Sequence, residues 1–434
     1  MKEMAMEGNE ASRRRKAIAW IVGIAMVGLM FDGYDLVVYG TVVSTFLRDP
    51  TQIGAVDPAL AGLLGSYALA GVLVGALVSG AIGDMVGRRR MMITAYAWFS
   101  LGMLLTAFTR ETGAFGVCRF FTGLGVGALL GTTAAMVSEY APPGRKNFYN
   151  AITYAGVPLG SLTAAGLAIL LLDHIGWRGM FMIGALPFVT LLPLSFFKMP
   201  ESVAWLVSRG RLDEARAIAA QTGIELPAQH AMHAVEEPGA SGYRGLFADF
   251  LLPTLLIGLM SGTGLILVYS LNTWLPELML RAGFNAKGSL SFLLVLNGGA
   301  VLGPLIAARF ADTIGPRVVV AACFLIGTAA ILALTLHLPL ALLLCIVAFA
   351  GVGTSGTQTL IYGLAANYFP TRVRGAAVAW CAGFGRLGGI GGPLIGGLLI
   401  AAGLSIQAIL LVLAGLALIG AALAMVIPAS RHAN

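Results

Sequence analysis

The chain has 434 residues, of which 58% are hydrophobic and only 11% are charged. A soluble domain carries about 25% charged residues, so this composition, with a mean hydropathy of +0.87, excludes an ordinary soluble protein and indicates an integral membrane protein. The net charge of +7 could suggest a nucleic-acid partner, but the positions of the basic residues give it another meaning.

Apolar stretches long enough to cross a bilayer as helices, about 20 residues each, recur along the whole chain. Lipid cannot satisfy the polar groups of an open backbone, and these stretches are too continuous for the alternating strands of a membrane barrel. We therefore predict an all-α protein with twelve spanning helices, at 17–44, 58–81, 91–109, 113–138, 149–172, 177–197, 248–275, 288–308, 317–336, 338–363, 375–401 and 404–428.

The basic residues are divided unevenly between the two ends of these spans. With the N-terminus in the cytoplasm, about 20 of the 27 Lys and Arg fall on the cytoplasmic side, which is the positive-inside pattern. Only Arg119 and Arg386 fall within the membrane, and the remaining five, on the outer side, are Arg48, Arg110, Arg178, Arg281 and Lys287. The positive charge therefore predicts topology, with both termini cytoplasmic, and no nucleic-acid partner.

The longest polar stretch, 199–247, separates the spans into six and six. Residues 200–223 are typical of a short amphipathic helix, and residues 225–245 are typical of a loop. The predicted organisation is a cytoplasmic tail (1–16), a six-helix bundle (17–198), a cytoplasmic central loop (199–247), a second six-helix bundle (248–428) and a cytoplasmic tail (429–434).

The two predicted bundles carry an internal repeat. A shift of 228 residues superposes landmarks in the same order, so that Asp84, Gly87, Arg89, Gly123, Gly125, Tyr140 and Pro142 meet Asp312, Gly315, Arg317, Gly351, Gly353, Tyr368 and Pro370. Matched order at one offset indicates duplicated halves. Parallel repeats of this kind build large transporters whose substrate site lies between the halves near the midplane.

The junction between the second and third spans reads GAIGDMVGRRRMM and resembles the signature loop of the major facilitator superfamily. Its residues here are Gly80, Asp84, Gly87, Arg88 and Arg89, and the second half keeps Asp312 and Arg317. The resemblance implies a gating role, in which the carboxylate caps a helix and pairs with arginine to hold the halves together on the cytoplasmic side. A simple basic turn is the alternative.

Three further motifs resemble the aromatic acid:proton symporter family, whose members carry benzoate-type carboxylates into bacteria. They are DGYDL (32–36), SLNTWLPELM (270–279) and NYFPTRVRG (367–375). The resemblance covers essentially the whole chain. It implies the twelve-helix facilitator fold, with two pseudo-symmetric halves, and a monomer in the bacterial inner membrane that imports benzoate or 4-hydroxybenzoate together with protons.

Four charges inside the spans have no counterpart in the repeat. Asp32 and Asp35 superpose on Gly262 and Leu265, Arg119 on Val347, and Arg386 on Pro158. An ionised Asp at the bilayer centre costs about 2.5–3.5 kcal/mol, so charges that break the symmetry are better candidates for function than for fold.

At least one of Asp32 and Asp35 is expected to be the proton-coupling carboxylate. Arg386 is the first choice to bind the substrate carboxylate, because its guanidinium offers a matching fork. Arg119 lies at a depth similar to that of the two Asp residues, so it is the second choice or pairs with one of them. A permanent buried ion pair that fixes helix register is the alternative.

Other polar and aromatic residues of the spans are candidates to line the ring pocket or bind ring hydroxyls, although each could instead serve helix packing. They are Tyr34, Tyr269, Asn272, Trp274, Asn297, Gln358 and Trp380. Glu139, at the cytoplasmic end of the fourth span, is expected to form a gating or structural salt bridge with Arg145 or a neighbouring loop.

No Walker loop for ATP and no nucleophile–base signature of an enzyme is found in the sequence. We expect no cofactor, and no metal site at the HAMH segment (230–233), which has no other ligand nearby. Import of another organic acid, such as a muconate or an aliphatic carboxylate, is the main alternative function. Efflux of a drug-like compound, or a non-transporting receptor, remains open; a receptor would often carry a signalling domain.

Overall fold

The computed structural model describes residues 2–142, 144–224, 226, 242–336 and 338–428, without the side chains of 2–11, 80, 81, 84, 147, 308, 312 and 371. In these ranges the regular elements are all helical. The first half contains α1 (Lys2–Arg48), α2 (Pro58–Val86), α3 (Arg88–Ala107), α4 (Thr112–Tyr140), α5 (Lys146–Tyr154), α6 (Gly156–Gly184), η1 (Leu186–Phe188) and α7 (Leu191–Lys198). The second half contains α11 (Leu251–Arg281), α12 (Ala286–Ile314), α13 (Pro316–Ala333), α14 (Leu340–Gly351), the π-helical turn η3 (Val352–Gly356), α15 (Thr357–Tyr368), α16 (Thr371–Ala401) and α17 (Ile406–Val426).

The twelve expected spans are confirmed. Ten helices in the described residues are long and apolar enough to cross a membrane. The eleventh span is α3, whose first residues are arginines, and the twelfth runs from Trp177 through η1 to the end of α7. It is joined to α6 at Gly176, whose φ of 64° breaks the helix and suits glycine.

The segment between the halves forms three short helices, α8 (Val203–Ser208), α9 (Leu212–Thr222) and α10 (Gly242–Asp249). The expected amphipathic helix is thus two helices, because the chain turns at Gly210 with a φ of 70°. The expected loop over 225–245 was wrong at its end, since α10 begins there and buries Leu246. The helix α1 begins at Lys2 and so includes the residues expected to form a tail.

The repeat is visible in the packing of equivalent residues. A methyl group added to Gly123 would meet the carbonyl of Ala68 at 2.0 Å, and one added to Gly351 would meet the carbonyl of Leu296 at 2.0 Å. The same shift of 228 residues relates both pairs. Each half therefore brings the same two helices into backbone contact, which only glycine permits.

Equivalent residues also form the ends of the helices. Asp57 accepts a hydrogen bond from the amide of Leu60 at the start of α2, and Asn285 does the same for Gly288 at the start of α12. Such caps satisfy otherwise unpaired amides of the first turn. The halves thus share local structure as well as helix order.

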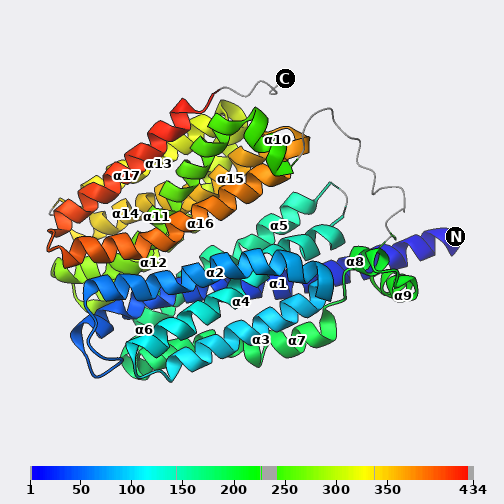
Figure 1. Cartoon of the computed structure of the whole chain (residues 1–434), viewed down its shortest axis with the longest axis horizontal. Coiled ribbons are helices and arrows are strands. Elements are labelled where there is room, and N and C mark those ends of the chain that lie inside the picture. Colours follow the sequence, from blue (N-terminus) through cyan, green and yellow to red (C-terminus); the bar gives the residue numbers. More distant parts are fainter. Residues whose placement is uncertain (1, 143, 225, 227–241, 337, 429–434) are drawn as a thin grey trace.

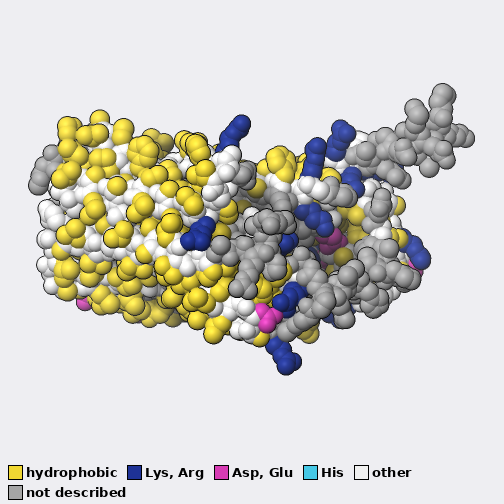
Figure 2. Space-filling model, turned by 90° about the horizontal axis from the view of Figure 1, so that it is seen from above, with side chains coloured by type: hydrophobic (Ala, Val, Ile, Leu, Met, Phe, Trp, Pro, Cys, Tyr) yellow, Lys and Arg dark blue, Asp and Glu magenta, His cyan; other side chains and the backbone are white. Residues whose placement is uncertain are grey.

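The two bundles lie side by side, with the N-terminus, the C-terminus and α8–α10 toward one end (Figure 1). Printed contacts between the bundles lie toward the other end. Ser66 on α2 donates to the carbonyl of Ile390 on α16 at 2.7 Å, and Gly40 on α1 lies against the backbone of Asn272 on α11. On the face in Figure 2, hydrophobic side chains cover the left part and Lys and Arg gather toward the right.

Candidate functional site

Arg119 and Asp35 form an ion pair inside the first bundle. Arg119 on α4 donates from Nη1 to the carboxylate of Asp35 on α1, and both side chains are fully buried. The guanidinium also lies over the rings of Tyr39 and Phe181, at 5.8 and 5.6 Å from their centroids. A pair with this many contacts leaves little room for a ligand at Arg119.

Asp32 has a different environment, although it lies only one helical turn from Asp35. It is 3% exposed, and within the described part of the chain it has no hydrogen bond and no ion pair within 4.0 Å. The charges that act on it electrostatically are Arg386 and Asp35. Arg386 is half-buried on α16, so Asp32 and Arg386 face each other across the two halves.

Three tyrosines complete the surroundings of Arg386. Tyr154 on α5, Tyr269 on α11 and Tyr362 on α15 all interact with it electrostatically. The site therefore draws on helices of both bundles. Sequence reasoning named Tyr269 but missed the other two; the spacing of four residues from Gln358 to Tyr362, which places them on one helix face, was the available signal.

The remaining ring-pocket candidates engage their polar atoms within their own bundle. Tyr34 donates to the carbonyl of Met180 at 2.7 Å, and Asn297 donates to Asn272 at 2.9 Å. The other three form the following contacts: Trp274 with the Pro393 carbonyl at 2.8 Å, Gln358 with Ser261 Oγ at 2.9 Å, and Trp380 with the Thr254 carbonyl at 3.0 Å. The structure thus groups Tyr269 with Arg386 and assigns these five side chains contacts that hold helices together.

A second group of predicted residues lies at the end of the first bundle that carries the N-terminus. The backbone amide of Arg89 donates to the carboxylate of Glu201 at 2.9 Å, and its guanidinium donates to the carbonyl of Phe196 at 2.5 Å. Gly87 has a φ of 102° and lies directly against the Glu201 carboxylate. The signature turn is thereby tied to the segment that follows α7.

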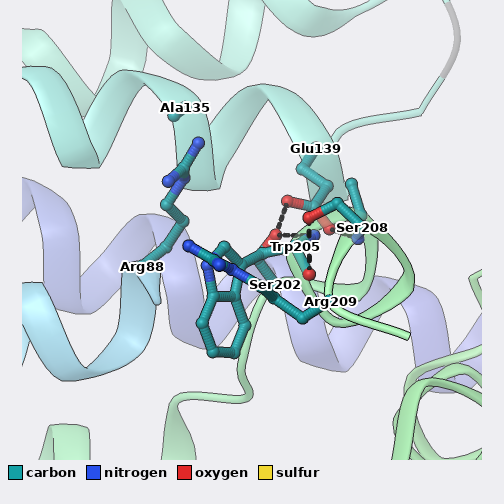
Figure 3. A pocket seen from close by; sticks show the side chains of 8 residues that line it. Arg88, Ala135, Glu139, Ser202, Trp205, Ser208 and Arg209 are labelled. Carbon is teal, nitrogen blue, oxygen red and sulfur yellow. Dashed lines mark hydrogen bonds between the residues drawn. The ribbon is translucent and has the colours of Figure 1, made fainter. Parts of the chain in front are cut away.

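Glu139 lines a cavity of about 470 Å³ together with Arg88 (Figure 3). Its carboxylate accepts hydrogen bonds from Ser202 Oγ at 2.5 Å and from the amide of Ala204 at 2.7 Å. Glu139 thus contacts the neighbouring segment before α8, one of the two expected partners. Arg145, the other, is exposed just before α5.

Arg317 in the second bundle repeats the contact of Arg89. Its guanidinium donates to the carbonyls of Ala424 and Met425 at the end of α17, and Ala424 is the repeat equivalent of Phe196. Each arginine therefore caps the last helix of its own bundle, where a cation is favoured. Gly80, Asp84 and Asp312 lie in helices, but their side chains are outside the described part of the structure.

Among the described residues, no group of three or more His, Cys, Asp or Glu could hold a metal ion. His230 and His233, considered above, lie outside the described residues.

Comparison with known proteins agrees with this geometry. A family model described as "Sugar (and other) transporter" matches residues 20–428. The chain belongs to the major facilitator superfamily. Members of this superfamily are multi-pass membrane transporters, not enzymes.

Curated relatives narrow the position of the chain in the superfamily. It is 32% identical over 391 residues to the benzoate transport protein of Acinetobacter baylyi, covering 88% of this chain and 83% of that protein. It is 34% identical over 398 residues to the gentisate transporter of Corynebacterium glutamicum, covering 91% and 83%. The resemblance to the aromatic-acid transporters is confirmed.

A solved facilitator structure has the same fold. The inward open conformation of the xylose transporter XylE from E. coli superposes with a TM-score of 0.76 at 18% identity, over 96% of this chain and 98% of that one. At this identity the likeness establishes the fold, and the substrate must be inferred from the site.

Proposed function

We propose that this protein imports an aromatic carboxylate of the benzoate or hydroxybenzoate type, together with protons, across the bacterial inner membrane. The observation that carries the proposal is the opposition of Arg386 and Asp32 across the two halves. The relatives support the substrate class, since those named above carry benzoate and gentisate.

In this proposal Arg386 binds the substrate carboxylate. Its guanidinium is half-buried and has no hydrogen bond to another described residue, so its donors are available for a bidentate contact. Tyr154, Tyr269 and Tyr362 would surround the aromatic ring and supply hydroxyl groups. The closed pair of Arg119 with Asp35 makes Arg119 the weaker candidate.

Asp32 is the proposed proton carrier. A buried carboxylate is tolerated only when its charge is compensated, and Arg386 is the cation that acts on it. When a substrate carboxylate engages Arg386, that compensation is shared, and a proton on Asp32 restores neutrality. Proton uptake and substrate binding would be coupled in this way.

Alternating access of the two halves would complete the cycle. The contacts between the bundles lie toward the end away from the termini, as expected for a state open toward the termini. We propose that this end faces the cytoplasm, because the basic residues gather there. The chain supplies both halves of the site, so a monomer is the proposed working unit.

The test is uptake of labelled benzoate and 4-hydroxybenzoate into proteoliposomes, with and without an imposed inward proton gradient. Wild-type protein should accumulate one of these acids only with the gradient. Asp32→Asn should lose accumulation but keep exchange of internal for external substrate, whereas Arg386→Ala should lose both. Accumulation without any dependence on protons would refute the coupling, and transport of muconate or an aliphatic acid alone would favour the alternative substrate class.

A further inference from the structure

A basic cavity of about 700 Å³ lies at the end of the first bundle near the N-terminus, apart from the Asp32–Arg386 site. Residues of α1, α3, α7 and the α8–α9 region line it. The charged ones are Arg13, Lys16, Arg89, Arg90, Lys198 and Arg211, opposed by Glu201 and Glu214. Six cations against two carboxylates leave a strong excess of positive charge.

The two acids of this cavity are already engaged. Glu201 accepts from the amides of Arg89 and Ser202, each at 2.9 Å. Glu214 accepts two hydrogen bonds from Arg211, at 2.7 and 2.6 Å, and these hold the pKa of its carboxyl below the usual value. The acids therefore neutralise little of the charge on the remaining cations.

Several of those cations lack a partner of their own. Lys16 and Arg90 are exposed and have no hydrogen bond or ion pair in the described part of the chain. Arg89 has a buried Nε with no hydrogen-bond partner. An unsatisfied buried donor among uncompensated cations points to an anionic ligand.

The rim of the cavity is apolar and belongs to the spanning helices. Trp20 on α1 is 44% exposed and Phe197 on α7 is 79% exposed, and both line the cavity. Lys198 lies over the Trp20 ring, 5.6 Å from its centroid. Exposed aromatic rings at helix ends mark the membrane–water interface, so the cavity opens where lipid headgroups lie.

We propose that this cavity binds the phosphate headgroup of an anionic phospholipid, with an acyl chain along Trp20 and Phe197. Arginine and lysine clusters between spanning helices at this depth suit such headgroups. Because Arg13 also donates to the carbonyl of Ala220 at 3.0 Å, a bound headgroup would join α1 and α3 to α9. The proposal does not depend on the transported substrate.

The test is native mass spectrometry of the full-length, delipidated protein in detergent, titrated with phosphatidylglycerol and with phosphatidylethanolamine. Wild-type protein should bind one phosphatidylglycerol in clear preference. The double variant Lys16→Gln/Arg90→Gln should bind it about thirtyfold more weakly, since each cation near an anionic headgroup contributes about fivefold. The matched control Arg244→Gln/Arg374→Gln removes two exposed cations from the second bundle and should bind like wild type.

Two further arms separate the possible sources of the anion. Inorganic phosphate and glycerol phosphate, at millimolar concentration, should not displace the lipid; if either does, the ligand is a soluble phosphate and the lipid assignment is overturned. The charge-conserving variant Lys16→Arg/Arg90→Lys should retain binding, which separates loss of charge from misfolding. Equal binding of the lipid by wild type and Lys16→Gln/Arg90→Gln would also overturn the proposal.

Discussion

Arg119 binds Asp35 within one bundle, whereas Asp32, one helical turn away, faces Arg386 of the other bundle. The two aspartates of DGYDL therefore occupy different environments. One belongs to a closed pair that joins α1 to α4, and the other lies at the interface between the halves. Four charges that break the repeat thus divide into one pair inside a bundle and one pair between bundles.

Breaking the closed pair should destabilise the protein. Asp35→Asn leaves the Arg119 guanidinium buried without its counter-ion, and removing one partner of a buried pair costs about 3–5 kcal/mol. Unfolding of the detergent-solubilised protein measures the loss. Asp35→Asn/Arg119→Leu should lose less than the two single variants combined, and additive losses would contradict the pairing.

Replacement of Arg386 by lysine should weaken the proposed substrate contact without abolishing folding. Lysine keeps the charge but loses the planar fork that binds a carboxylate through two bonds. One charged hydrogen bond contributes about 1.5–3 kcal/mol, so the KM for uptake should rise about tenfold or more. Arg374→Lys, an exposed change on the same helix, is the control, and an unchanged KM in Arg386→Lys would exclude this contact.

Glu277 should stabilise the state in which the halves meet at the end away from the termini. It is 3% exposed, accepts from Arg281 Nε at 2.7 Å, and lies 3.9 Å from Arg48 of the first bundle. Glu277→Gln removes the attraction between bundles and should open this end. Distances between spin labels at Ala55→Cys and Leu404→Cys, in a background without the native cysteines, measure the opening.

Asp173→Asn provides the matched control for Glu277→Gln. Asp173 pairs with Lys287 at 3.6 Å and also joins the bundles, but both side chains are more than half exposed. Exposed pairs contribute about 0–1 kcal/mol, so the label distances should hardly change. A larger opening in the control than in Glu277→Gln would contradict the assigned role.

The glycines that bring helices into contact should tolerate no side chain. In Gly123→Ala the new methyl group meets the Ala68 carbonyl at 2.0 Å, and overpacking of this kind costs about 1–3 kcal/mol. Gly131→Ala on the same helix meets nothing within 4 Å and should be neutral or slightly stabilising. Thermal unfolding of both variants is the measurement, and equal midpoints would show that α2 and α4 are not in close contact.

The sequence by itself determined the spans, the repeat and the charges that break it. Hydropathy records whether a segment can enter lipid, and this property is carried by each segment alone. The repeat was visible because both halves use glycine at equivalent contacts, such as Gly123 and Gly351. The family followed from motifs that lie within single segments.

Only the tertiary structure decided which charges meet. Spacing of three residues places Asp32 and Asp35 on neighbouring parts of one helix face, but their partners depend on how α1 is rotated against α4 and α16. The roles of Tyr154, Tyr362 and Glu277 were hidden for the same reason. Such contacts join residues far apart in the chain, and their geometry is fixed by the close packing of helices, which no local pattern of residues encodes.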